Sequence, residues 1–213
     1  MRKDAMRREL AVRHRLVPTL VAVLISLSAL HSRSPVMEAF QVERSFVEIQ
    51  IQRWTREVGK NPKDFETMAA IGAAYGKLDR YDKAVEWYQR ALAVNPSYAE
   101  AYLGLGSVYG FQGRLDDKIT ACKRAIKLKP DYADAYFTIG TAYGKRGQYQ
   151  KAAGALREGV RLEPASAEGH FALGLAYVSL GDLAHASTEQ RILTRLDGSL
   201  ANRLKKIIDA PNP

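Results

Sequence analysis

The stretch IGAAYGKLDRYDKAVEWYQRALAVNP, residues 71–96, decides the fold because its pattern recurs along the chain at a fixed period. Proline stands at positions 62, 96, 130 and 164, so successive prolines are 34 residues apart. Aligned on this period, four copies match without gaps. A fixed period of a few tens of residues is typical of solenoid proteins, in which one supersecondary unit is stacked repeatedly.

The first half of each copy predicts an amphipathic helix. With residues 65, 99, 133 and 167 taken as position 1 of repeats 1 to 4, position 7 is isoleucine or leucine and position 8 is always glycine. Position 11 is always tyrosine, and position 4 is methionine, tyrosine or histidine. Positions 4, 7, 8 and 11 share one face of an α-helix, so this face is predicted to be buried.

The second half of each copy predicts another helix, antiparallel to the first. A stripe at positions 20, 24 and 27 supplies its buried face, and the helix ends before the next proline, which cannot continue it. Between the two helices, position 15 is Gly113, Gly147 or Gly181 in repeats 2 to 4 and Asp79 in repeat 1. Glycine takes the left-handed conformation that ends a helix readily, whereas aspartate takes it less well.

The glycine at position 8 indicates close packing between the two helices. Glycine inside a helix costs about 1 kcal/mol relative to alanine, so its recurrence indicates a compensating contact. Without a Cβ atom the partner helix can approach closely, and the small residue at position 20 is predicted to face this glycine. The copies depart from the pattern at Lys118 (position 20), Gly159 (position 27) and Gln190 (position 24).

The pattern M-x-x-I-G-x-x-Y…A-x-x-x-Y-x-x-A…P at residues 68–96 resembles the tetratricopeptide repeat. The corresponding segments YLGLGSVY, YFTIGTAY and HFALGLAY of the other copies resemble it as well. The resemblance covers residues 63–198 and implies an all-α fold, an α-solenoid of four 34-residue helix-turn-helix repeats. Stacked hairpins of this kind bury a continuous core that no single hairpin can form.

The segments beside the repeats predict two further helices. Residues 34–62 are interpreted as an amphipathic capping helix and linker, with Trp54 at position 24 of a preceding half-repeat. The alternative is a free helix that binds a partner. Residues 199–213 are interpreted as a C-terminal solvating helix, with Ser199 as its N-cap, followed by a frayed tail.

Residues 1–33 have the layout of an export segment. The basic stretch MRKDAMRRELAVRHR precedes LVPTLVAVLISLSAL, which carries no charge. Its shortness favours a cleaved signal peptide, but no Ala-x-Ala cleavage motif follows it, which favours an N-terminal membrane anchor. We therefore expect an inner-membrane-anchored protein with its repeats facing the periplasm; the alternative is a secreted or periplasmic form after signal cleavage.

The residues of the repeats predict no catalytic site, no metal site and no cofactor. Cys122 is the single cysteine, and His170 and His185 are the only histidines of the repeats, without a cluster of acidic residues around them. The glycines follow the repeat period and form no phosphate-binding loop. More than half of the formal net charge of +9 lies in residues 1–33, which argues against a nucleic-acid partner. No small-molecule substrate is predicted either.

The resemblance implies that the concave surface lined by the first helices binds a peptide or protein segment. The candidate groove residues are Lys77, Leu103, Phe111, Phe137, Thr141, Lys145, Phe171 and Leu175. Chaperone-binding relatives clamp a C-terminal carboxylate with Asn at position 9 and Lys or Arg near positions 5 and 13. Here position 9 has no Asn and position 5 has no base, so this clamp is not expected. What remains is a groove with aromatic anchors and two lysines.

The predicted function is a non-enzymatic scaffold for protein–protein interaction. The expected setting is envelope assembly or maturation, because residues 1–33 predict export. The alternative is an accessory subunit or regulator of an envelope enzyme or of a secretion or pilus complex. The identity of the partner is not encoded in any motif of the sequence.

Overall fold

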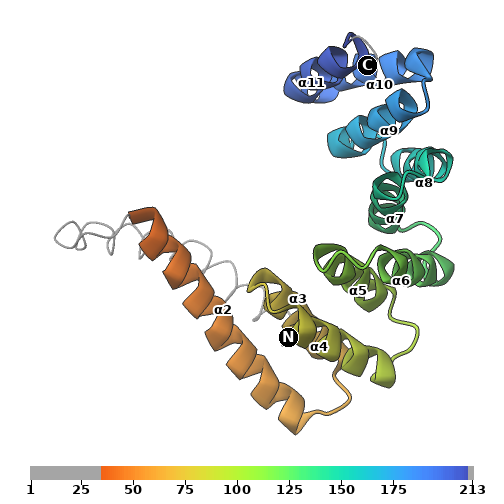
Figure 1. Cartoon of the computed structure of the whole chain (residues 1–213). Coiled ribbons are helices and arrows are strands. Elements are labelled where there is room, and N and C mark those ends of the chain that lie inside the picture. Colours follow the sequence, from red (N-terminus) through yellow and green to blue (C-terminus); the bar gives the residue numbers. More distant parts are fainter. Residues whose placement is uncertain (1–34, 211–213) are drawn as a thin grey trace. The chain divides into compact units, whose positions relative to one another are not determined.

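The computed structural model describes residues 35–210, which form ten α-helices and no strand (Figure 1). Their bounds are α2 (Pro35–Lys60), α3 (Phe65–Lys77), α4 (Tyr81–Val94), α5 (Ala99–Phe111), α6 (Leu115–Leu128), α7 (Ala133–Lys145), α8 (Tyr149–Leu162), α9 (Ala167–Ser179), α10 (Leu183–Leu196) and α11 (Gly198–Ile208). The predicted all-α class and the four helix pairs are confirmed.

The chain divides into two compact units, Met1–Arg56 and Glu57–Pro213. The described part of the first unit is most of α2, in which Phe46 and Ile49 are exposed and Ile51 is buried. The predicted capping role of residues 34–62 stays a prediction. The predicted leader, residues 1–33, lies outside the described residues. Among the helices that are described, none combines the length and the apolar character that a membrane span requires.

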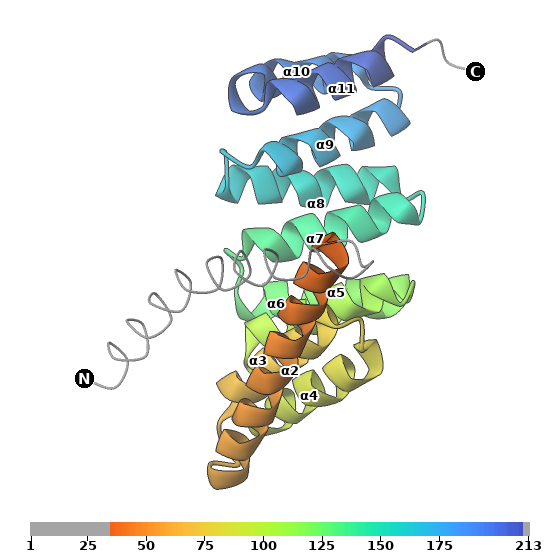
Figure 2. The ribbon, with the colours of Figure 1, turned by 90° about the vertical axis from the view of Figure 1, so that its left-hand side faces the viewer.

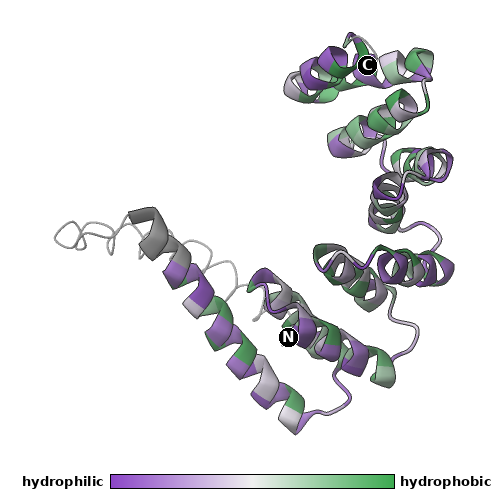
Figure 3. Cartoon of the chain, in the orientation of Figure 1, coloured by the Kyte–Doolittle hydropathy of each residue, from purple (hydrophilic) through white to green (hydrophobic). Residues whose placement is uncertain are grey.

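The second unit is built from the hairpins α3/α4, α5/α6, α7/α8 and α9/α10, followed by α11. Each second helix also contacts the first helix of the next hairpin, so the hairpins stack in chain order (Figure 2). Hydrophilic and hydrophobic residues share the helices of this unit (Figure 3), as expected for helices that bury one face.

The turn inside each hairpin has the same backbone geometry in all four repeats. Gly113, Gly147 and Gly181 have φ values of 74°, 70° and 75°, and Asp79 has φ 60° in the same place. In repeat 2 the N–H of Arg114 donates to the carbonyl of Tyr109 at 2.9 Å, and the equivalent bond closes the other three turns. This bond satisfies a carbonyl that the end of the first helix leaves unpaired. Asp79 therefore takes the conformation that the sequence predicts for glycine.

The glycine at position 8 lies against the second helix, as predicted, but its closest neighbour is a different residue. A Cβ atom on Gly106 would lie 2.7 Å from Cys122 Sγ, and one on Gly140 would lie 2.6 Å from Leu156 Cγ. Both neighbours occupy position 24. Position 20 was predicted to face the glycine with a small side chain; it contributes a backbone carbonyl instead, such as Lys118 O at 3.4 Å.

The last repeat uses α11 to complete this packing. A Cβ atom on Gly174 would collide with Leu204 of α11, so Leu204 takes the place that position 24 fills in the other repeats. Leu204 is fully buried with Leu193 and Ala201. The prediction that Ser199 caps α11 is wrong: the side chain of Asp197 accepts the N–H groups of Ser199 and Leu200 at 2.8 and 3.0 Å. The extended backbone of Asp197 places its carboxylate over these two N–H groups.

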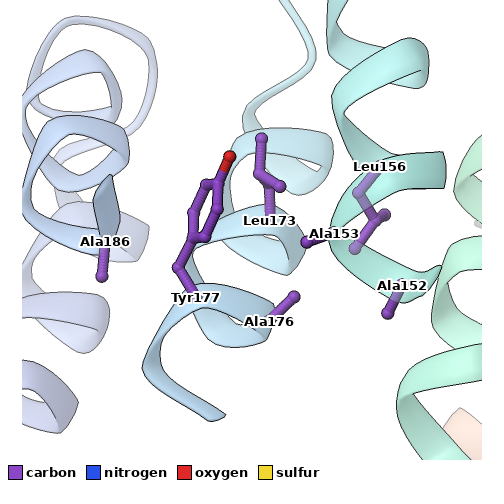
Figure 4. Close-up of a cluster of buried hydrophobic side chains, with 7 residues drawn as sticks. All are labelled: Ala152, Ala153, Leu156, Leu173, Ala176, Tyr177 and Ala186. Atoms are coloured by element: carbon purple, nitrogen blue, oxygen red, sulfur yellow. The ribbon is translucent and has the colours of Figure 1, made fainter. Parts of the chain in front are cut away.

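A buried cluster joins repeats 3 and 4 (Figure 4). Its members come from α8, α9 and α10: Ala152, Ala153, Leu156, Leu173, Ala176, Tyr177 and Ala186. In Figure 4 the side chain of Ala176 points toward α8, Tyr177 lies on the side of α10, and Leu173 lies between Tyr177 and Ala153. Four of the seven members are the small residue alanine, which allows neighbouring helices to approach closely.

Gly159 departs from the repeat pattern at position 27, and the reason is Phe137, which packs against this cluster. A Cβ atom on Gly159 or on Gly169 would lie 2.5 Å from Cε1 of the Phe137 ring. The ring is thus held between α8 and α9 by two residues that lack side chains. Repeat 3 combines phenylalanine at position 5 with glycine at position 27. Repeats 1 and 2 have alanine at position 27.

Replacing Gly159 with alanine is expected to lower the free energy of unfolding by about 1–3 kcal/mol, because the new methyl group overlaps the Phe137 ring. In a Phe137→Ala background the same change should instead stabilise by about 1 kcal/mol, the helix preference of alanine over glycine. Urea denaturation of the four proteins measures this reversal of sign. Gly154 on the same helix is the control, because a Cβ atom there meets nothing within 4 Å; Gly154→Ala should stabilise in both backgrounds.

Stability is also expected to fall at alkaline pH because of the buried residues at position 24. Burial raises the pKa of the Cys122 thiol from 9.0 to about 12, and that of Tyr88 from 10.0 to about 12. The unfolded chain therefore releases these protons before the folded chain does, and the free energy of unfolding falls as pH rises from about 9 to about 12. Thermal melts of Cys122→Ala should show a weaker fall over this range. An unchanged pH dependence would contradict the assignment to Cys122.

Candidate peptide-binding surface

The candidate groove residues come from the first helices α3, α5, α7 and α9. Successive first helices contact one another directly, so they form one continuous layer. Positions 5, 9 and 13 lie on one side of each first helix, since an α-helix turns by about 100° per residue. The eight predicted residues occupy these three positions, and they therefore share one side of the layer.

The exposure of the eight residues divides them into two groups. Lys77, Phe111, Thr141 and Lys145 are exposed, whereas Leu103, Phe137, Phe171 and Leu175 are half-buried. The second group belongs largely to the packing of the repeats. Leu103 packs against a buried cluster that includes Cys122 and Ile139, and Phe137 packs on two glycines as described above.

Phe171 and Leu175 are covered in part by the C-terminal helix. Both pack against the cluster of Leu193, Ala201 and Leu204, which α10 and α11 form with α9. The guanidinium of Arg203 lies over the Phe171 ring at 4.9 Å from its centroid. In repeat 4 the predicted groove residues therefore hold α11 in place, and the exposed part of the surface lies on repeats 1 to 3.

Phe111 is the most exposed large apolar residue of the described chain, with 70% of its surface accessible. Its ring stacks on Tyr81 of repeat 1, with centroids 5.5 Å apart and an interplanar angle of 6°. The hydroxyl of Tyr81 donates to Asp79 at 3.1 Å, and Gln112 Nε2 donates to Asp82 at 2.9 Å. These contacts hold the Phe111 ring in one orientation while one of its faces stays in solvent.

Tyr81 and Asp79 belong to this surface, although the repeat pattern did not identify them. Tyr81 begins the second helix of repeat 1, and Phe111 ends the first helix of repeat 2. Their contact crosses from one repeat to the next, so it is invisible in an alignment that compares positions within single copies. The only available signal was that Phe111 is aromatic where Lys77 and Lys145 stand in neighbouring copies.

The surface carries opposite charges at its two ends. Acidic residues lie in the first turn of each first helix, and Lys77 and Lys145 lie in the last turn of α3 and α7. Half-buried Lys118 adds to the basic end, since its amine approaches Gly110 in the last turn of α5. Burial lowers the pKa of Lys118; Cys122 opposes this shift, and the charge of Lys145 adds to it. This distribution also complements the helix dipoles.

The described residues offer little chemistry for catalysis. Cys122 is fully buried and its raised pKa keeps the thiol protonated near neutral pH. Among residues 35–210 no group of three or more His, Cys, Asp and Glu side chains is placed to hold a metal ion. His170 is buried, as its aromatic repeat position predicts, with Nδ1 2.6 Å from Glu189 Oε2 and Nε2 3.1 Å from the Pro164 carbonyl.

Comparison with known proteins identifies repeat families and similar structures. A model described as "TPR repeat" matches residues 72–113 and 111–147, and one described as "Tetratricopeptide repeat" matches residues 137–199. The crystal structure of MamA is similar with a TM-score of 0.67 and 24% identity, covering 77% of this chain and 96% of that one. No curated protein sequence matches this chain.

Two further similar structures have titles that mention peptides. YrrB, "a TPR protein with an unusual peptide-binding site", has a TM-score of 0.64 and 21% identity, covering 72% of this chain and 82% of that one. The first TPR domain of Spaghetti (RPAP3), bound to the HSP90 peptide SRMEEVD, has a TM-score of 0.54 and 21% identity, covering 55% and 93%. At these identities the likeness shows the fold alone.

Proposed function

We propose, from the premise that this chain belongs to the tetratricopeptide repeat family, that it is a non-enzymatic scaffold. Its concave surface binds a segment of a partner protein. The observation that carries this proposal is the exposed ring of Phe111, which stacks on Tyr81. A large apolar side chain held in one orientation at the surface contributes binding energy without a further loss of conformational freedom.

The surroundings of Phe111 indicate what kind of segment fits. Lys77 and Lys145 occupy the same repeat position on the flanking first helices, and both are exposed. Neither lysine makes an ion pair with another described residue. A segment with an apolar side chain for Phe111 and an acidic residue for either lysine would match this end of the surface. The two similar structures whose titles mention peptides support the general class of ligand, although position 9 here is Ala73, Ser107, Thr141 and Leu175 and offers no asparagine.

Replacing Phe111 with alanine is expected to weaken binding of selected peptides at least tenfold, which corresponds to about 1.4 kcal/mol. Peptides would first be selected from a random library against the wild-type repeats, and their affinity then measured by fluorescence anisotropy. The thermal melt should change little, because most of the ring faces solvent. Leu183→Ala is the matched control, since Leu183 is also an exposed apolar residue but lies on a second helix. Equal affinities for wild type and Phe111→Ala would move the site elsewhere.

We infer further that the scaffold acts in the bacterial envelope, in assembly or maturation of other proteins. The support is the basic stretch and the uncharged stretch of residues 1–30. A membrane anchor at this end would leave the repeats in the periplasm, where partners of an envelope complex are accessible. An accessory role beside an envelope enzyme or a secretion or pilus complex would use the same surface.

The anchored form is expected to stay in the membrane pellet after an alkaline carbonate wash of cells that express the full chain. An uncleaved apolar segment resists this treatment, whereas peripheral proteins are released by it. Mass spectrometry of the N-terminal peptide supplies the second readout. A soluble mature protein that begins near residue 30 would replace the anchor with a cleaved signal peptide.

A further inference from the structure

Repeat 2 has a second candidate surface, a hollow of about 460 Å3 between α5 and α6. We name it the repeat 2 hollow. Its lining consists of Tyr102, Leu105, Tyr109, Asp117, Thr120, Ala121, Lys123, Arg124 and Lys127. On α5 these residues occupy positions 4, 7 and 11, which lie roughly opposite positions 5, 9 and 13 of the same helix. The hollow and the surface around Phe111 are therefore on different sides of α5.

The hollow coincides with a small residue at position 23 of repeat 2. In repeat 4 the residues at positions 4 and 23 touch, since His170 Nδ1 lies 2.6 Å from Glu189 Oε2. In repeat 1 position 23 is Trp87, which is buried with 7% of its surface accessible. Repeat 2 has Ala121 in this position, which lines the hollow together with Tyr102 and has 7% of its surface accessible. Repeat 2 thus supplies no large side chain of its own at the position that Trp87 and Glu189 occupy in repeats 1 and 4.

Repeat 1 shows how this place is filled by an aromatic ring. The guanidinium of Arg90, at position 26, lies over the Trp87 ring at 3.9 Å from its centroid. Repeat 2 has Arg124 at position 26, on the rim of the hollow. Within residues 41–210 Arg124 makes neither an ion pair nor a ring contact. Repeat 3 differs, because its Ala155 packs against the neighbouring buried cluster and its position 26 is Glu158, paired with Arg161 at 2.8 Å.

The rim of the hollow is positively charged. Lys123 and Lys127 flank Arg124, and these two lysines also form no ion pair with a described residue. The single acidic residue of the lining, Asp117, is paired with Arg114 at 2.7 Å. Arg114 in turn lies 4.4 Å from the centroid of the Tyr109 ring, so it holds both side chains in place. The unpaired charge on the rim is therefore entirely basic.

We propose that the repeat 2 hollow binds an aromatic side chain of an acidic segment in a partner protein. The ring occupies the place that Trp87 fills in repeat 1 and stacks under Arg124. Lys123 and Lys127 pair with acidic residues on either side of the aromatic residue. This surface goes beyond the proposed function around Phe111 and allows the scaffold to hold two partner segments on opposite sides of repeat 2.

The test uses two fluorescein-labelled peptides, one with a central tryptophan flanked by glutamates and one with alanine in place of the tryptophan. Fluorescence anisotropy with the full chain should show at least tenfold tighter binding of the tryptophan peptide. Ala121→Trp copies the arrangement of repeat 1 and should abolish this preference, because the hollow is then filled by the chain itself. Its melting temperature should not fall, since Trp87 is accommodated at the equivalent position.

Charge variants test the rim without touching the core. Arg124→Ala should lower the affinity for the tryptophan peptide at least tenfold. Arg90→Ala, its counterpart in repeat 1, should leave this affinity unchanged. The double variant Lys123→Glu/Lys127→Glu should abolish binding of the tryptophan peptide. The control double variant Arg157→Glu/Lys206→Glu makes the same change in net charge away from the hollow and should have little effect. Because these residues are exposed, the comparison stands even where Ala121→Trp fails to fold.

Four results would overturn the proposal. Equal affinities for the two peptides would show that the hollow does not select an aromatic ring. Unchanged binding by Arg124→Ala would remove the rim from the site, and loss of binding in Phe111→Ala would place the probe on the other surface. Displacement of the peptide by a single-stranded oligonucleotide through the same basic residues would replace the peptide with a nucleic acid. If Phe111→Ala leaves the affinity for the library-selected peptides unchanged, the proposed function around Phe111 fails, but the proposal for the repeat 2 hollow is not affected.

Discussion

The close approach of two helices at position 8 is the contact on which the rest of the array depends. Glycine there removes the Cβ atom that would collide with the side chain at position 24, as for Gly106 with Cys122 and Gly140 with Leu156. The cost of glycine in a helix, about 1 kcal/mol relative to alanine, is offset by the dense packing that it permits. Repeats 1 to 3 are closed in this way by the side chain at position 24, and in repeat 4 Leu204 of α11 takes its place against Gly174.

A repeated scaffold leaves function to the residues that differ between copies. Phe111 is aromatic where repeats 1 and 3 carry lysine, and Ala121 is small where repeat 1 has tryptophan and repeat 4 has glutamate. The first difference produces an exposed ring that Tyr81 holds in place, and the second produces a basic-rimmed hollow on another side of the same hairpin. Repeat 2 consequently carries residues of both candidate surfaces, on different sides of α5.

The candidate residues could be selected from the sequence, but how far each is exposed to solvent could not be predicted from it. Leu103 and Phe137 occupy groove positions by the repeat pattern, yet both are half-buried in contacts between repeats. Phe137 is held by Gly159 and Gly169, which lie more than twenty residues away and belong to different helices. A pattern within one copy carries no information on such contacts, because they depend on which neighbour is packed beside the copy.

The sequence by itself determined the number of helices, their pairing into hairpins and the turn that closes each pair, because these features depend on spacing and on local backbone preference. Only the tertiary structure decided that Leu204 completes the last repeat, that Asp197 caps the C-terminal helix and that Phe111 stays in solvent. The physical reason is that a period of 34 residues describes contacts inside a repeat, whereas burial and exposure depend on side chains that meet between repeats.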